Sequence, residues 1–192
     1  MLAAGRSRRM ERWKMTLPLG EATIVESSVR TALEVCDRLI LVAGYRAEEL
    51  AELFRERERV RVVVNPTYEE GMFSSVRCGS SQVQSTWFFL ALGDMPLVDP
   101  GTYRLLLRFA EDLPVGGSVR IPALVPRFRG KKGHPLLLSR QIKERILAAP
   151  PTVTLREVLA EEPNLLVPVD DPHVLQDIDT TEDYRGLSKA ES

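Results

Sequence analysis

The chain has 192 residues, of which 44% are hydrophobic and 28% charged, and its 26 basic and 27 acidic side chains leave a net charge of −1. That length allows one α/β domain with a sizeable core. The balanced charge lacks the basic surplus that nucleic acids and anionic membranes attract. No apolar run approaches the roughly 20 residues of a membrane span, and the N-terminus lacks the apolar region of a signal peptide. We therefore expect a cytoplasmic protein with no nucleic-acid or membrane partner.

The first half of the chain alternates between short apolar runs and segments with helical periodicity. The apolar runs cover residues 38–44, 60–65 and 87–93. Near-continuous apolarity over strand length is typical of a parallel sheet that is buried on both faces. Apolar residues recur at helical spacing in residues 23–36, 47–59 and 100–111. This alternation predicts a doubly wound α/β sheet with right-handed crossovers.

The second half of the chain is less regular. Its composition predicts strands over residues 118–124, 135–138 and 164–169, and helices over residues 140–148 and from Thr154 to Leu159. The tail after Tyr184 is polar, and we expect it to fray. No internal repeat and no long linker divides the chain, so we predict a single domain over residues 1–192.

The stretch Ala3-Ala-Gly-Arg-Ser7 follows a first, very short apolar segment. Ligands of open α/β sheets bind beyond the carboxyl ends of the strands. Small side chains let backbone N–H groups approach an anion, and lysine suits phosphate as a compact point charge. The basic residues that follow are Arg6, Arg8, Arg9, Arg12 and Lys14. The stretch is either a phosphate-binding loop or a basic, flexible terminus without a ligand.

A second polar stretch follows the apolar run at residues 60–65. Gly71 precedes a serine-rich helix start. Free N–H groups and hydroxyls at the positive end of a helix dipole would hold a base edge or a phosphate there. The alternative is an ordinary helix N-cap by Ser74 or Ser75.

Acidic residues follow the third apolar run and recur late in the chain. Asp94 comes directly after that run, where it would hold Mg²⁺ or form a turn within Gly93-Asp-Met-Pro96. Asp177 and Asp179 share one face if their segment is extended, which would make them a second arm of a metal site. Alternatively, Asp179 or Thr180 caps a helix.

These features combine into one kind of site. A glycine loop with a lysine would bind a triphosphate, and two separated aspartates would hold the metal that bridges its phosphates. Such a site catalyses nucleotidyl transfer by positioning and charge neutralisation. His134 would either contact a substrate or pack as a hydrogen-bonded histidine.

The order of the motifs resembles the nucleotidyltransferases of molybdenum-cofactor synthesis, a family of cytidylyltransferases and closely related guanylyltransferases. The motifs are Leu2-Ala-Ala-Gly-x-Ser-x-Arg-Met10 with Lys14, Asn65-Pro-x4-Gly-Met-x-x-Ser75, Gly93-Asp-Met-Pro-Leu97, Gly133-His-Pro135 and Asp177-Ile-Asp-Thr180. They span nearly the whole chain. The resemblance implies a three-layer α/β/α Rossmann-like fold with a mostly parallel sheet, a nucleotide half at about residues 1–98 and an acceptor half at about residues 99–186.

The resemblance also implies a reaction and a set of site residues. The terminal phosphate of molybdopterin would attack the α-phosphate of a nucleoside triphosphate, and pyrophosphate would leave. Catalytic roles are implied for Arg9, Lys14 and Asp94. Ligation of Mg²⁺, or alternatively Mn²⁺, is implied for Asp94 and Asp179, and acceptor contacts for Gly133 and His134. Nucleotide contacts are implied for Leu2, Ala3, Ala4, Gly5, Lys14, Asn65, Gly71 and Ser75.

The resemblance favours CTP as the nucleotide, because the guanylyltransferases resemble this loop with a glycine at the position of Ala4. One methyl group discriminates by roughly 1–3 kcal/mol. The alternatives are GTP, another triphosphate with a sugar phosphate acceptor, or a non-catalytic module that holds the molybdenum cofactor for maturation. A molybdoenzyme or its chaperone is a further expected partner.

Two departures from the family pattern concern the N-terminal stretch. The pattern has several apolar residues ahead of Leu2, so either the chain starts late or residues 1–4 form only a stub of a strand. Glu11 stands where the pattern has glycine. A carboxylate there would repel the triphosphate unless it turns outward or pairs with Arg8 or Arg12.

Overall fold

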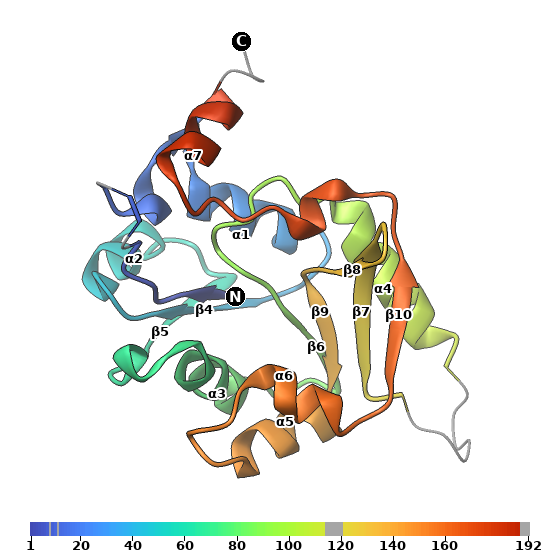
Figure 1. The fold of residues 1–192 in the computed structure, drawn as a ribbon. Helices are drawn as coiled ribbons and strands as arrows, with labels where there is room; N and C mark the ends of the chain where they lie inside the picture. Colours follow the sequence, from blue (N-terminus) through green and yellow to red (C-terminus); the bar gives the residue numbers. More distant parts are fainter. Residues whose placement is uncertain (8, 11, 114–120, 189–192) are drawn as a thin grey trace.

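A β-sheet runs through the protein and carries helices on both faces (Figure 1). The structure is a computed structural model that describes residues 1–7, 9–10, 12–113 and 121–188. One ladder has the order β1-β4-β5, with β1 (Leu2–Ala3), β4 (Leu39–Ala43) and β5 (Val60–Val64) all parallel. The other has the order β10-β7-β9-β6, formed by β6 (Trp87–Leu90), β7 (Ala123–Phe128), β9 (Leu136–Ser139) and β10 (Asn164–Pro168).

The two ladders meet at the end of β6. Leu2 forms a parallel bridge with Leu92. The N–H of Leu2 donates to the carbonyl of Ala91 at 2.9 Å, and the N–H of Gly93 donates to the carbonyl of Leu2 at 2.8 Å. The strands therefore follow the order β5-β4-β1-β6-β9-β7-β10. Among the named strands of this order, only β9 runs antiparallel to its neighbours, so the predicted mostly parallel sheet is confirmed.

Helices cover the two faces of the sheet in two separate sets. On one face lie α1 (Ile24–Leu33), α2 (Ala47–Leu53) and α4 (Pro100–Glu111), and on the other α3 (Met72–Gln82), α5 (Arg140–Ala148) and α6 (Leu155–Ala160). Because successive strand residues point to opposite faces, Leu41 packs with the first set and Val42 with the second. The predicted three-layer α/β/α fold is confirmed. Among the described residues, no helix is long and apolar enough to cross a membrane.

The C-terminal helix α7 (Thr181–Ser188) packs beside a small hairpin near the N-terminus. The hairpin strands are β2 (Pro18–Leu19) and β3 (Ala22–Thr23). The hydroxyl of Tyr184 donates to the carbonyl of Pro18 at 2.7 Å, and Leu187 packs against a buried cluster of Leu17, Leu19, Ile24 and Ile178. The prediction that the chain frays after Tyr184 is therefore wrong as far as Ser188.

Most predicted elements lie within a few residues of the observed ones. The helices at residues 100–111 and 140–148 coincide with α4 and α5. The helix predicted at residues 47–59 is too long, because Phe54 is the last residue there that packs in the core and the charged residues 55–59 offer no apolar face. The strand predicted at residues 118–124 begins instead at Ala123 and continues to Phe128. Residues 118–120 lie outside the described part of the chain.

β1 is two residues long and begins beside a gap in the sheet. The amino nitrogen of Met1 donates to the carbonyl of Ile40 at 2.8 Å, where a peptide N–H of a longer strand would pair. Ahead of Met1, a cavity of about 800 Å³ is lined by β4, by β6 and by the ends of α1 and α3. Burial lowers the pKa of the amino group to about 5, because the charged form has lost its water.

We predict that a chain prepared to begin at Met1 loses stability as pH falls from 8 to 5. The pKa of the amino group is about 5 in the folded state against an ordinary value of 8.0. The unfolded chain therefore takes up the proton first, which lowers the free energy of unfolding by at most about 4 kcal/mol. Urea unfolding at several pH values measures this change. An N-terminally acetylated chain is the control and should lack this part of the pH dependence; identical profiles for both chains would contradict a buried amine.

Candidate active site

The loop after β1 is fixed by hydrogen bonds from residues that follow it. The indole Nε1 of Trp13 donates to the carbonyl of Gly5 at 3.0 Å, and the N–H of Lys14 donates to Oγ of Ser7 at 3.1 Å. Ser7 adopts a left-handed backbone with φ of 51°. A Cβ atom added at Gly5 would meet nothing within 4 Å, so the space beside the loop is open. This bonding disfavours a flexible terminus. The sequence motif of this loop includes Ser7 but does not single out Trp13.

Lys14 lies between two carboxylates from distant parts of the chain. It belongs to a short 3-10 helix, η1 (Lys14–Thr16), and its side chain is 8% exposed. Its Nζ lies 2.6 Å from Oδ2 of Asp94 and 2.7 Å from Oδ1 of Asp179. Burial favours the neutral amine, but the two carboxylates outweigh it and raise the pKa of Lys14. Arg9 forms an ion pair with the other oxygen of Asp179.

Backbone bonds hold the two aspartates at this distance. Asp94 follows β6, and its carbonyl accepts a hydrogen bond from the N–H of Ile178 at 3.0 Å. The side chain of Ile178 is buried at 3% exposure. Thr180 caps α7, because its Oγ1 accepts from the N–H of Asp183 at 3.2 Å. Of the two residues predicted as possible caps, Thr180 is therefore the one that caps the helix. The carboxylate of Asp179 instead faces Lys14 and Arg9.

Asp177 completes a group of three carboxylates with Asp94 and Asp179. Each offers one oxygen, and these oxygens all lie within 4.8 Å of one another. Partial burial, followed by the charge of Asp179, raises the pKa of Asp177. Carboxylate oxygens are the ligands that Mg²⁺ and Mn²⁺ prefer. The expected same-face placement of Asp177 and Asp179 is thus realised, and the arrangement is compatible with a divalent cation.

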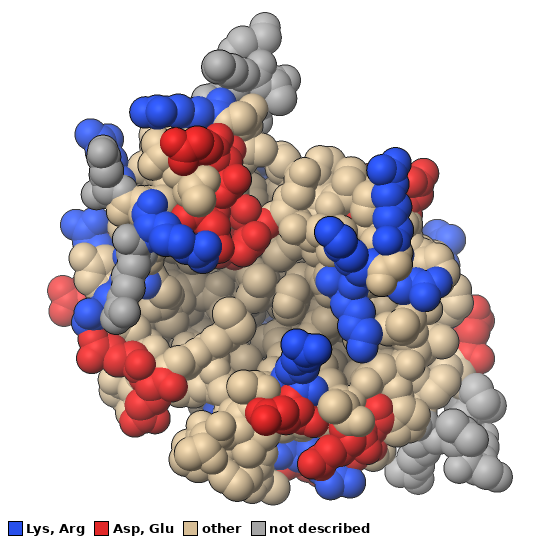
Figure 2. Space-filling view, in the orientation of Figure 1, with Lys and Arg blue, Asp and Glu red and all other residues tan. Residues whose placement is uncertain are grey.

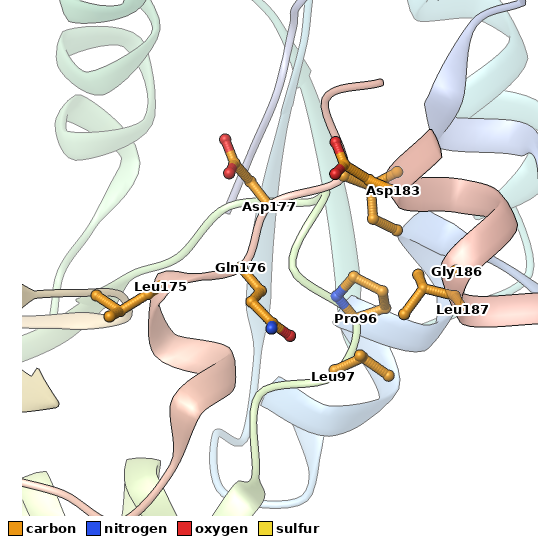
Figure 3. A pocket seen from close by; sticks show the side chains of 9 residues that line it. Pro96, Leu97, Leu175, Gln176, Asp177, Asp183, Gly186 and Leu187 are labelled. Atoms are coloured by element: carbon orange, nitrogen blue, oxygen red, sulfur yellow. The ribbon is translucent and has the colours of Figure 1, made fainter. Parts of the chain in front are cut away.

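A cavity of about 500 Å³ lies beside the carboxylates, between the loop after β6 and α7. Figure 3 shows the carboxylates of Asp177 and Asp183 at one end, with Gln176, Pro96 and Leu187 further along it. Asp183 is engaged by the N–H of Thr180 at 2.8 Å. Asp177 is therefore the carboxylate that connects this cavity to the group of three.

Asn65, directly after β5, bonds to Ser75 in the first turn of α3. Both are 3% exposed. Nδ2 of Asn65 donates to Oγ of Ser75 at 3.0 Å and to Oγ of Ser74 at 2.9 Å. Gly71, with φ of 112°, is the residue that caps α3, and no side chain caps this helix. The alternative of an N-cap by Ser74 or Ser75 is therefore wrong. The nucleotide contacts predicted for Asn65, Gly71 and Ser75 stay predictions.

Arg6 joins the loop after β1 to the segment between β5 and α3. Its guanidinium donates to the hydroxyl of Tyr68 at 3.1 Å and forms an ion pair with Glu69. Ala4 lies on the same side, since a Cβ atom added at Gly44 would sit 2.9 Å from Cβ of Ala4 and 2.6 Å from Cβ of Tyr68. The structure thus brings the two predicted nucleotide-binding stretches together. Arg8 and Glu11 lie outside the described residues, so the repulsion expected from Glu11 stays a prediction.

Gly133 and His134 lie in the segment just before β9, and the N–H of His134 donates to the carbonyl of Val174 at 2.9 Å. The N–H of Gly133 donates to the carbonyl of Pro126 at 2.9 Å, and a Cβ atom there would lie 2.3 Å from the carbonyl oxygen of Val174, so a larger residue would clash. Nδ1 of His134 is buried and has no hydrogen-bond partner among the described residues. Burial lowers the pKa of His134, and a hydrogen bond to the backbone of Leu90, followed by the charge of Asp94, partly offsets this. His134 is therefore a packed, neutral histidine with one unpaired nitrogen.

The surface around these residues is hollowed. Figure 2 shows acidic side chains on the side of α7, basic side chains over β7 and the short strand β8 (Lys131–Lys132), and a depression between them.

Known proteins are similar to this chain in sequence and fold over most of its length. A family described as "MobA-like NTP transferase domain" matches residues 1–174. The molybdenum cofactor cytidylyltransferase of Escherichia coli (strain K12) is 33% identical over 182 residues, which cover 95% of this chain and 90% of that protein. A probable molybdenum cofactor guanylyltransferase of Mycolicibacterium paratuberculosis is 27% identical over 198 residues, covering 99% of this chain and 94% of that protein.

Solved structures are also similar to this chain over almost its whole length. A crystal structure of Rv0371c from Mycobacterium tuberculosis H37Rv matches with a TM-score of 0.80 and 27% identity, over 98% of this chain and 95% of that chain. A structure of the same protein in complex with manganese matches with a TM-score of 0.76 and 26% identity, over 98% of this chain and 96% of that chain.

We predict that Lys14→Met tightens Mn²⁺ binding in the absence of nucleotide. The ammonium lies 2.6 Å and 2.7 Å from the carboxylates that a cation would use, so a cation must displace it. A charge-assisted contact of this kind contributes about 1.5–3 kcal/mol, so the affinity should rise about tenfold or more. Equilibrium titration followed by electron paramagnetic resonance measures it. Lys143→Met, which removes a charge on α5, is the matched control; equal affinities in the two variants would contradict the prediction.

Proposed function

Because the chain belongs to the MobA-like NTP transferase family and is a nucleotidyltransferase of molybdenum-cofactor biosynthesis, we propose that it transfers CMP from CTP to molybdopterin. A phosphate oxygen of the acceptor attacks the α-phosphate of CTP, and the bond to pyrophosphate breaks. The observation that carries this proposal is the position of Lys14, between Asp94 and Asp179 and beside the open loop after β1.

A divalent cation, Mg²⁺ or Mn²⁺, fits the donor set of this chain. Asp94 and Asp179 would hold it, with Asp177 as a third donor close by. When bound, the cation supplies positive charge that neutralises the triphosphate. The manganese complex of the Mycobacterium tuberculosis protein supports this choice of ligand class.

The cationic side chains of the site would act on the phosphates. Lys14 and Arg9 would stabilise the negative charge that develops as pyrophosphate leaves, since fixed charges in a partly buried site need little reorganisation. The backbone of Ala3 to Gly5 would face the triphosphate across the open space beside Gly5. Leu2 would fix this loop through its bonds to Ala91 and Gly93.

The base would lie toward the turn that follows β5. Asn65 and Ser75 hold this turn in shape, and the space beside Gly71 is open. Two observations favour CTP over GTP. The methyl group of Ala4 narrows this side against Gly44 and Tyr68, and the relative with 33% identity is a cytidylyltransferase. Gly133 and His134 would contact the acceptor.

Pyrophosphate release tests the proposal. Wild-type protein with Mg²⁺, intact molybdenum cofactor and CTP should release pyrophosphate faster than the same mixture with GTP. Asp94→Asn should reduce the rate by roughly 10²–10³-fold, as expected for the loss of a charge-stabilising group at the reacting phosphates. Asp112→Asn, at the exposed end of α4, is the matched control and should keep the wild-type rate.

Two results would overturn the proposal. The absence of pyrophosphate release with either nucleotide would exclude nucleotidyl transfer to this acceptor. A faster reaction with GTP would assign guanylyl transfer, in line with the relative of 27% identity.

A further inference from the structure

The hairpin that leads to His134 carries an unbalanced positive charge. Residues 127–132 read Arg-Phe-Arg-Gly-Lys-Lys, four cations without an acidic residue in a chain whose net charge is −1. The cations are Arg127, Arg129, Lys131 and Lys132, and all four are exposed. The ion pairs found among the described residues include none of them. Arg129 lies over the ring of Phe128 at 5.1 Å.

The register of the hairpin opposes two like charges directly. β8 (Lys131–Lys132) pairs antiparallel with β7, and Arg127 stands opposite Lys132. Opposed residues of an antiparallel pair project to the same face, where like charges are destabilising. A bound anion would remove this cost, because one guanidinium and one ammonium on the same face can share it.

The hairpin is fixed in place beside the predicted acceptor residues. The N–H of Gly133 bonds to Pro126 of β7, and the backbone of Gly133 and His134 packs closely against Val174. The basic group in Figure 2 accordingly borders the hollow opposite the acidic group.

The unpaired nitrogen of His134 is a second sign that a ligand is accommodated here. Buried polar atoms are nearly always hydrogen-bonded, yet Nδ1 of His134 lacks a partner. This atom follows directly on the charged hairpin in the chain. The chain therefore places a buried, unpaired polar atom directly after the four cations.

We propose that Arg127 and Lys132 bind the phosphate monoester of the acceptor, with Lys131 and Arg129 adding to the local positive potential. The inference rests on the proposed function and specifies how its second substrate is held. The hairpin leads directly into Gly133 and His134, the predicted acceptor residues, so it is expected to act on the acceptor. It sets the affinity for the acceptor and leaves the affinity for CTP unchanged.

The kinetic test compares two double variants of equal charge. Arg127→Gln/Lys132→Gln removes the opposed pair, and Arg57→Gln/Arg61→Gln removes two exposed cations near the start of β5. The hairpin variant should raise the KM for the acceptor by about tenfold or more, with the KM for CTP within about twofold of wild type. The control variant should change neither. An acceptor KM equal in both variants, or a parallel rise in both KM values, would overturn the inference.

A binding test separates this inference from the proposed function. Inorganic phosphate should shift the amide resonances of Gly130 and Gly133 in wild-type protein and not in the hairpin variant. If these shifts occur while no pyrophosphate is released, the anion site stands and the proposed reaction fails. If pyrophosphate is released without such shifts, the anion site is wrong. Tight binding of polyglutamate through the hairpin, with an unchanged acceptor KM, would show a protein-docking surface and overturn the inference.

Discussion

The ion pairs of Lys14 join the two ends of the chain into one site. Asp94 and Asp179 belong to segments far apart in the sequence, and their carboxylates would repel each other at this distance. The largely buried ammonium, 2.6 Å and 2.7 Å from them, removes that repulsion. Partial burial alone would raise the pKa of Asp179, but the bond to Lys14 outweighs it and lowers the pKa. In the free protein the ammonium of Lys14 thus already lies where the proposed reaction needs a positive charge.

Backbone hydrogen bonds hold the charged side chains of this ion pair in position. Ile178 is anchored by its N–H on Asp94 and by its buried side chain, so the residues on either side of it face the site. On the far side of the hollow, β7 and β8 present the opposite charge. Two anionic substrates would therefore meet a divalent cation on one side and fixed side-chain cations on the other, with their reacting groups between.

The sequence predicts the layers of this fold and the main charges of its site. The α4 helix is predicted correctly because apolar residues recur at helical spacing over residues 100–111, and the place of Asp94 at the end of a strand is predicted because it follows an apolar run. Three features of the site depend on tertiary packing or strand register, which no local sequence pattern predicts. Asp177 and Asp179 are predicted to share a face, but they reach Asp94 only because Ile178 between them is hydrogen-bonded to it. Trp13 supports the loop through one bond to Gly5. Arg127 and Lys132 oppose each other only in the observed hairpin register.

Anomalous diffraction from crystals grown with Mn²⁺ and a non-hydrolysable CTP analogue tests the assignment of the site most directly. We predict one manganese peak in contact with the carboxylates of Asp94 and Asp179, and Nζ of Lys14 withdrawn from both and directed at the phosphates. A manganese peak elsewhere, or a Lys14 that still bridges both carboxylates beside a bound nucleotide, would contradict it.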